Sequence, residues 1–169
     1  SLTLLVDVQT AERPWEGYNR RFLERAVTAG ASLASHAVER GFRLGMISNG
    51  IPLSASGRMV IPPGADQGRL LAILEALAMV RPLSLGRLDA VMDKEPRAIP
   101  FGATVVAISA VLPEGLMRAL DRLVARGHPA LAIFVGDGEP PSAGGRFEVR
   151  SMGPAFDVEQ EDFKVNWVG

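Results

Sequence analysis

Residues 2–8, LTLLVDV, decide the fold class because they form a near-continuous apolar run of strand length. Such a run is typical of a strand that is buried on both faces of a parallel sheet. The run closes on Asp7 and Val8, and QTA (9–11) follows. Domains with such sheets bind ligands beyond the carboxyl ends of their strands. DVQTA (7–11) is therefore the first candidate for a functional site.

Strand and helix patterns alternate along the rest of the chain. The strand at 58–62 is expected at an edge of the sheet, because Pro62 and the adjacent Pro63 cannot donate hydrogen bonds to a neighbouring strand. Asp66 is expected to cap the helix that follows it, and Gly41 and Gly127 are expected to end two others. Strands are predicted over 2–8, 42–48, 58–62, 102–109, 129–136 and 146–152, and helices over 19–40, 66–81, 85–93 and 113–126.

This order of elements predicts an α/β fold, with a doubly wound, mostly parallel sheet flanked by helices and one antiparallel edge strand. The first helix carries Ala26, Gly30 and Ala34 on its apolar stripe, which indicates very close packing against the sheet. The acidic stretch 157–162 is interpreted as a short surface segment, and residues 163–169 are interpreted as a tail.

Composition limits the possible functions. The chain has 169 residues, of which 47% are hydrophobic and 22% charged, so residues 1–169 are interpreted as one globular domain. A net charge of −1 gives no electrostatic reason to expect nucleic acid as a partner. Cysteine is absent, which excludes disulfides and thiolate metal sites. Because a strand begins at the second residue, we expect the domain to come from a longer protein.

Five stretches together resemble a known family: LTLLVDVQT (2–10), AVTAGASLASH (26–36), GFRLGMISNG (41–50), IPPG (61–64) before a helix, and GATVVAIS (102–109). They are similar to the carboxyl-terminal, von Willebrand factor A-like part of the domain of unknown function 58 family, over residues 2–135. The resemblance implies a bacterial, membrane-anchored protein with this domain on the cytoplasmic face of the membrane. It also implies gene neighbourhood with MoxR-like AAA-type ATPases, and hence such an ATPase as a protein partner.

Von Willebrand A domains often hold a divalent metal, and the resemblance shows where its ligands would lie. Asp7 matches the first aspartate of an aspartate-x-serine-x-serine stretch, but Gln9 and Ala11 occupy the two serine positions. The loop PPGADQG (62–68) has no threonine, although it contains Asp66, and Ala110 occupies the later aspartate position. Because Mg²⁺ requires an octahedral set of hard oxygen ligands, these residues predict a degenerate site without bound metal.

Asp7 can instead have a purely structural role. A carboxylate at this position can accept hydrogen bonds from nearby backbone amides, or from Ser48 or Asn49 on the neighbouring strand. A divalent metal held by Asp7 with Gln9, Thr10 or Asp66 is the competing interpretation.

Enzymatic chemistry has little support in the sequence. His36 and His128 are both isolated from ligand-spaced partners, and there is no G-x-S-x-G elbow, P-loop or Rossmann glycine pattern. A hydrolase or a nucleotide-binding enzyme is therefore the weakest of the functional interpretations.

Two aromatic residues follow the first strand in RPWEGYNRR (13–21). Trp15 and Tyr18 could form a contact surface for a partner, since aromatic side chains are favoured at interface centres. Alternatively, Trp15 could fold over the sheet and fill the cleft that a metal would occupy. The sequence predicts a non-enzymatic protein-interaction domain with no cofactor; a metal-dependent binding domain is the alternative.

Overall fold

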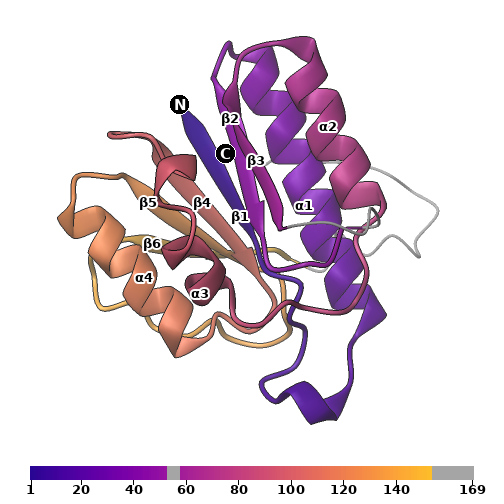
Figure 1. The fold of residues 1–169 in the computed structure, drawn as a ribbon. Coiled ribbons are helices and arrows are strands. Elements are labelled where there is room, and N and C mark those ends of the chain that lie inside the picture. Colours follow the sequence, from indigo (N-terminus) through magenta and orange to yellow (C-terminus); the bar gives the residue numbers. More distant parts are fainter. Residues whose placement is uncertain (53–57, 154–169) are drawn as a thin grey trace.

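Six strands form one central sheet in the computed structural model, which describes residues 1–52 and 58–153 (Figure 1). The strand order is β3-β2-β1-β4-β5-β6, and every neighbouring pair is parallel except β2 and β3. The predicted doubly wound sheet with one antiparallel edge strand is thereby confirmed. The strands are β1 (Leu2–Val6), β2 (Leu44–Ser48), β3 (Met59–Gly64), β4 (Thr104–Ser109), β5 (Ala130–Phe134) and β6 (Glu148–Ser151).

Helices cover both faces of the sheet, so the domain has three layers (Figure 1). Helices α1 and α2 lie side by side on one face, and α3 and α4 lie on the other. The helical elements are η1 (Pro14–Glu16), α1 (Arg20–Glu39), α2 (Gln67–Ala78), α3 (Leu88–Asp93), η2 (Pro96–Ala98) and α4 (Glu114–Ala125). The predicted surface segment at 157–162 and the tail at 163–169 lie outside the described residues.

The central strand β1 explains why the opening run is apolar throughout. Leu4 and Val6 pack into the core beneath α1, while Leu5 packs into the core on the opposite face, and all three are fully buried. The predicted close packing of α1 is confirmed at Gly30. A β-carbon there would lie 3.6 Å from Val6 Cγ2 and 3.3 Å from Leu77 Cδ1, so the helix approaches both sheet and α2 closely.

Local sequence signals set the helix ends. Asn19 caps α1 by accepting a hydrogen bond from Phe22 N at 3.3 Å, and Asp66 caps α2 through Arg69 N at 2.9 Å. Gly41 follows α1 with a φ of 75°, a conformation that glycine adopts without a steric cost. No helix in residues 1–52 and 58–153 is long and apolar enough to span a bilayer.

Candidate functional site

The carboxylate of Asp7 lies at the carboxyl end of β1 and is only 2% exposed. Its Oδ1 accepts hydrogen bonds from Gln9 N at 3.0 Å and from Asn49 Nδ2 at 2.9 Å. Its Oδ2 accepts a hydrogen bond from Ser109 Oγ at 2.8 Å. Both oxygens are therefore engaged by donors of the protein itself. The donor on the neighbouring strand is Asn49, whereas the hydroxyl of Ser48 accepts from Gly50 N instead.

Asn49 connects this carboxylate to two loops. Its Oδ1 accepts from Val8 N at 2.9 Å, and its Nδ2 donates to Gly86 O at 3.0 Å as well as to Asp7. The side chain is fully buried, so these bonds satisfy its carbonyl and amide groups away from water. Asn49 thus holds the loop after β1 against the segment before α3.

Ser109 makes the same kind of connection at the end of β4. While its hydroxyl donates to Asp7, its oxygen accepts from Leu112 N at 2.9 Å and from Val111 N at 3.3 Å. Leu112 has a φ of 42°, a left-handed conformation that is uncommon outside glycine. The Ser109 oxygen therefore helps to hold a strained turn that leads into α4. We call Asp7, Asn49 and Ser109 the polar floor.

Burial controls the protonation of the polar floor. Burial raises the pKa of the Asp7 carboxyl above its ordinary value, although its hydrogen bonds with Gln9, Ser109 and Asn49 lower it. The nearby carboxylate of Asp89 adds a further upward contribution to this pKa. The net shift is upward, so the folded protein favours the neutral form of Asp7 more than the unfolded chain does.

Asp89 and Arg87 belong to the same end of the sheet but carry no distinguishing sequence signal. Asp89 is buried on α3, and Arg87 donates to it through Nε at 3.1 Å and also through Nη2. A β-carbon at Gly115 would lie 2.7 Å from Asp89 Oδ2, so glycine admits this carboxylate to the first turn of α4. A negative charge there is favourable because helix amino ends carry a partial positive charge.

Three of the positions predicted from the metal-site pattern lie in the described loops at this end. Gln9 does not point an oxygen at Asp7; its Nε2 donates to Ala11 O at 2.9 Å and to Glu12 O at 3.3 Å. Ala11 and Ala110 offer no side-chain ligand, and Ala110 is buried. Gln9 therefore braces its own loop.

Asp66 lies at the other end of the sheet from Asp7. Gly64, the last residue of β3, pairs with Leu44 at the start of β2, whereas Met59 pairs with Ser48 at its end. Because β3 runs antiparallel to β2, the chain leaves β3 at the amino end of the parallel strands. The grouping of Asp66 with Asp7 was therefore wrong, since it ignored this reversal. Asp66 caps α2 there instead.

These residues do not fit a divalent metal. The oxygens of Asp7 are buried and occupied by three donors, and a hard cation would need several further oxygen ligands that Ala11 and Ala110 cannot supply. Within residues 1–52 and 58–153, no group of three or more histidine, aspartate or glutamate side chains is placed to hold a metal ion.

The histidines lie elsewhere. His128 precedes β5 and is buried, with Nδ1 3.1 Å from Ala103 O, and the exposed His36 is in the last turn of α1. Both are at the amino end of the parallel strands, opposite Asp7.

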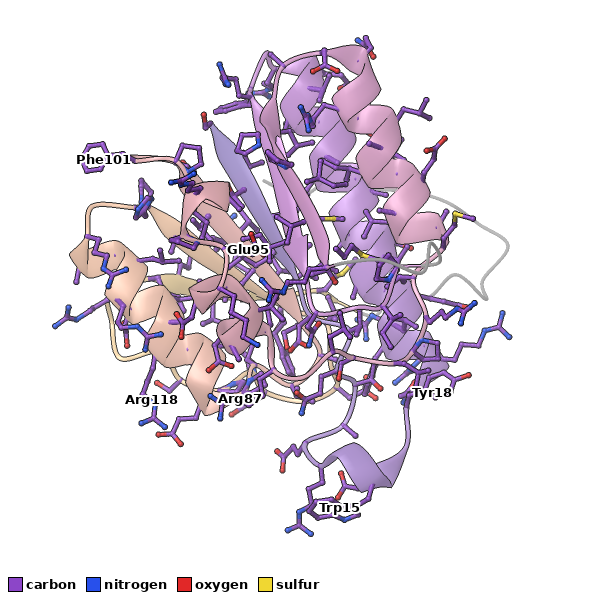
Figure 2. The ribbon with its side chains drawn as sticks, in the orientation of Figure 1. Trp15, Tyr18, Arg87, Glu95, Phe101 and Arg118 are labelled. Carbon is purple, nitrogen blue, oxygen red and sulfur yellow. The ribbon has the colours of Figure 1, made fainter. Side chains whose placement is uncertain are left out.

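Trp15 stands at the tip of the loop that follows β1. It is 78% exposed, and the guanidinium of Arg13 lies 5.8 Å from the centre of its ring. Figure 2 shows Trp15 projecting away from the body of the domain, whereas Tyr18 lies closer to that body. The interpretation that Trp15 fills the cleft above the sheet is therefore wrong. Its loop turns outward through η1, and its indole is left facing solvent.

Two hollows meet beside Tyr18. The first, which we call the carboxyl-end cleft, has a volume of about 310 Å³ and lies between the loops 8–18 and 82–87. The second, which we call the helix groove, has a volume of about 400 Å³ and lies along α1 and α2. Tyr18 and Pro82 line both, so the two hollows are adjacent. Leu83 and Leu85 are also exposed on the second loop.

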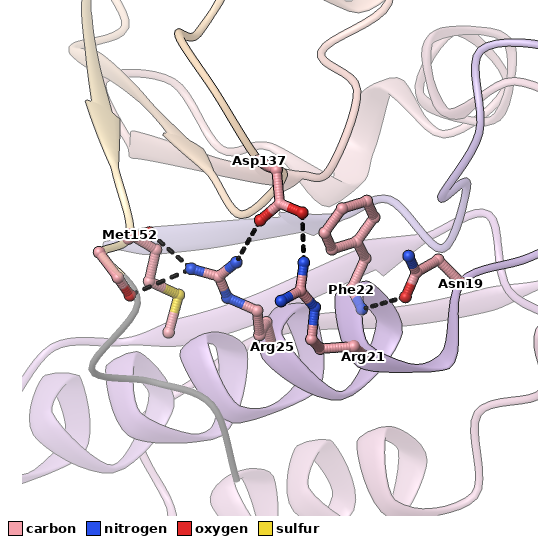
Figure 3. A network of polar contacts seen from close by, with 7 residues as sticks. Asn19, Arg21, Phe22, Arg25, Asp137 and Met152 are labelled. Carbon is pink, nitrogen blue, oxygen red and sulfur yellow. Dashed lines mark hydrogen bonds and ion pairs between the residues drawn. The ribbon is translucent and has the colours of Figure 1, made fainter. Parts of the chain in front are cut away.

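A cluster of charges fixes the amino end of α1 to the far strands (Figure 3). The buried Arg25 donates through Nη2 to Met152 O at 2.7 Å and to Gly153 O at 3.0 Å, and its Nη1 lies 3.6 Å from Asp137 Oδ1. Arg21 pairs with the other oxygen of Asp137. Asp137 thus joins the loop after β5 to α1.

Comparisons with known proteins identify the type of fold. No family model matches the chain, and no curated protein matches it. The structure is similar to the solved VWA domain of SpRpn10, with a TM-score of 0.54 and 12% identity over 89% of this chain and 86% of that one. It is also similar to proximal thread matrix protein 1 from the mussel byssus, with a TM-score of 0.54 and 13% identity over 89% of this chain and 43% of that one.

The likeness at these identities concerns the fold alone. The chain has a von Willebrand A-like fold, as predicted. Membership of the domain of unknown function 58 family stays a prediction.

Proposed function

We propose that the chain is a non-enzymatic protein-interaction domain whose partner contacts the carboxyl end of the sheet. One observation carries this proposal: exposed apolar side chains gather on the two loops that frame the carboxyl-end cleft. Such a concentration is typical of interaction sites, whereas single exposed apolar residues are ordinary. These side chains, which we call the apolar rim, are Trp15, Tyr18, Leu83 and Leu85.

The proposal includes a degenerate metal site beneath the rim. The position of Asp7 is that of a metal ligand in related folds, but its carboxylate is closed off by Gln9, Asn49 and Ser109. Recognition then depends on the side chains of the rim and needs no shared cation. A divalent metal at Asp7 is the competing function, and no observation favours it.

The sequence resemblance supplies a candidate partner. We infer that the domain belongs to a bacterial, membrane-anchored protein of the domain of unknown function 58 family, faces the cytoplasm and binds a MoxR-like AAA-type ATPase. The quoted motifs within residues 2–109 support this inference.

Two measurements test the proposal together. The first follows binding of a purified MoxR-like ATPase encoded beside this gene by isothermal titration calorimetry, a signal that does not depend on the tryptophans of the chain. Trp15→Ala is expected to weaken binding about tenfold, the equivalent of about 1.4 kcal/mol. The matched control is Phe101→Ala. Phe101 is 94% exposed but precedes β4 at the opposite end of the sheet (Figure 2), so its removal is expected to leave binding unchanged.

The second measurement is a thermal melt with and without millimolar MgCl₂ or MnCl₂. An unchanged Tm is expected; a rise would indicate metal binding to the folded state and would favour the competing function. Equal weakening by the Trp15 and Phe101 variants would contradict the proposed surface.

A further inference from the structure

We propose that the partner contributes an acidic, apolar segment of polypeptide, which lies along the helix groove and places a carboxylate in the carboxyl-end cleft between Arg13 and Arg87. This inference rests on the proposed function and adds the chemistry of the partner. It follows from the adjacency of the two hollows and from the different charged residues that line them.

The helix groove is the apolar half of this surface. Side chains of both helices line it, with Leu23 and Val27 from α1 and Leu77 from α2. The two charged residues in its lining, Arg20 and Glu24, pair with each other at 2.7 Å. Their charges therefore offset one another, and the groove favours apolar side chains of the partner.

The carboxyl-end cleft is the basic half. Arg13 and Arg87 are the two charged residues in its lining, and no aspartate or glutamate among the described residues lines it. Its other polar groups include the hydroxyls of Thr10 and Ser84. The Thr10 oxygen already accepts from Asn19 N at 2.8 Å. An anionic group is the ligand that this combination of cations and neutral donors fits.

Arg87 is held ready for such a contact. Its Nε and Nη2 donate to Asp89, which fixes the plane of the guanidinium, while the side chain remains 68% exposed. Asp89 is itself buried, so it orients Arg87 from below without reaching into the cleft. A guanidinium has five N–H donors, and the edge away from Asp89 can donate to a second carboxylate.

Arg13 is placed on the other wall. Its guanidinium lies over the ring of Trp15, a contact that holds a flexible side chain close to the rim. Three arginines and one glutamate line the two hollows together, although the whole chain has a net charge of −1. The carboxyl-end cleft presents two guanidinium groups and no carboxylate in its lining, although the charge of Arg87 is partly offset by the buried Asp89, and this arrangement favours an anionic group from the partner.

The polar floor does not oppose an anion in the cleft strongly. Asp7 precedes Val8 and Gln9, which line the cleft, but its carboxylate is shielded by its three donors, and burial raises its pKa. The carboxylate in contact with the lining is Asp89, which bonds one edge of Arg87, so Arg13 and the other edge of Arg87 are the groups that would meet an anion.

Selection of short peptides tests the proposal. A random dodecapeptide display library is panned on the whole chain, and enriched peptides are resynthesised and titrated by fluorescence polarisation. We expect enriched peptides to combine aspartate or glutamate with aliphatic or aromatic residues. The Arg13→Gln/Arg87→Gln variant is expected to bind them about tenfold more weakly, and to lose most of the salt dependence. The control is Arg40→Gln/Arg43→Gln, which removes two exposed arginines at the opposite end of the sheet.

The possible outcomes separate this inference from the proposed function. Binding that depends on Trp15 and Tyr18 but survives loss of Arg13 and Arg87 would overturn the acidic segment and leave the proposed surface intact. Binding indifferent to all four residues would overturn both. Enriched peptides without carboxylates, or no enrichment at all, would overturn the segment, while the ATPase titration would still decide the proposed function. Each variant is checked for an unchanged Tm.

Discussion

The polar floor and the apolar rim occupy the same end of the sheet but invert the usual distribution of side chains. Asp7, Asn49 and Ser109 are polar and buried, whereas Trp15 and Leu83 are apolar and exposed. Buried polar groups require complete hydrogen bonding, and exposed apolar groups gain nothing from folding. If the rim is the partner surface proposed above, stability and recognition depend on different side chains at this end of the sheet. The floor holds the loops, and the rim is free to contact a partner.

The largest expected effect comes from removing the centre of the floor. Asp7→Ala leaves the N–H of Gln9, the amide of Asn49 and the hydroxyl of Ser109 without their acceptor. We expect the free energy of unfolding to fall by about 3 kcal/mol, because buried donors without partners are costly. Urea unfolding measures the loss.

Asp93→Ala is the control for this loss. Asp93 is an exposed carboxylate whose ion pair with Arg122 spans 3.7 Å. Its removal is expected to change the free energy of unfolding by less than about 1 kcal/mol. An equal effect of both substitutions would break the distinction between floor and surface.

Ser109→Ala is expected to cost about 2 kcal/mol. It removes a donor to Asp7 and the shared acceptor for the amides of Val111 and Leu112. Ser84→Ala, at an exposed hydroxyl of the second loop, is the matched control and should be nearly neutral. Both are measured by urea unfolding. A Ser109 variant as stable as the wild type would show that the turn at Val111 and Leu112 does not depend on the Ser109 hydroxyl.

The pH dependence of stability isolates the charge of Asp7. Its pKa is raised in the folded protein above the ordinary value of 3.8, so the folded state keeps a proton that the unfolded chain releases. The stabilising contribution of Asp7 is therefore complete below pH 3.8. It declines as pH rises toward the folded pKa, by up to about 1.4 kcal/mol for each pH unit.

Asp7→Asn lacks this titration and provides the comparison. Relative to the wild type, it should gain stability as pH rises above 3.8, in urea unfolding series at matched ionic strength. If the difference in free energy of unfolding between the two proteins were constant across pH, burial would not shift the pKa of the Asp7 carboxyl.

The smallest expected effect on stability comes from the rim. Trp15→Ser and Tyr18→Ser replace exposed apolar side chains, so the free energy of unfolding should change by less than about 0.5 kcal/mol for Trp15 and little more for Tyr18. Differential scanning calorimetry checks this. A large loss from Trp15→Ser would mean that the aromatic loop supports the fold and would remove the separation of floor from rim.

Local patterns predicted the elements well, because burial on two faces leaves a continuous apolar run at 2–8 and small residues mark the packed stripe of α1. The position of Asp7 at a strand end could be predicted for the same reason. The partners that close the site could not be predicted fully. Asn49 and Ser109 are 42 and 102 residues away in sequence, and only the strand order brings them together.

The direction of β3 and the direction of the loop that carries Trp15 could not be predicted from local sequence patterns either. The prolines placed β3 at an edge but did not show that its reversal moves Asp66 away from Asp7. The outward turn of Trp15 likewise depends on η1 and has no signature in hydropathy. Asp89 was missed because an acidic residue in the first turn of a short helix is ordinary.

The two prolines of β3 also limit how this domain can associate with other chains. A sheet edge with free N–H and C=O groups can accept a further strand, and edges of this kind promote aggregation. Pro62 and Pro63 have no N–H to donate, so this edge strand offers fewer donors to a further strand. At the opposite edge, Glu148 and Arg150 form an exposed ion pair on β6. Prolines on one edge strand and charged side chains on the other both disfavour strand addition, which agrees with the proposal that a partner binds at the ends of the strands, where the rim lies.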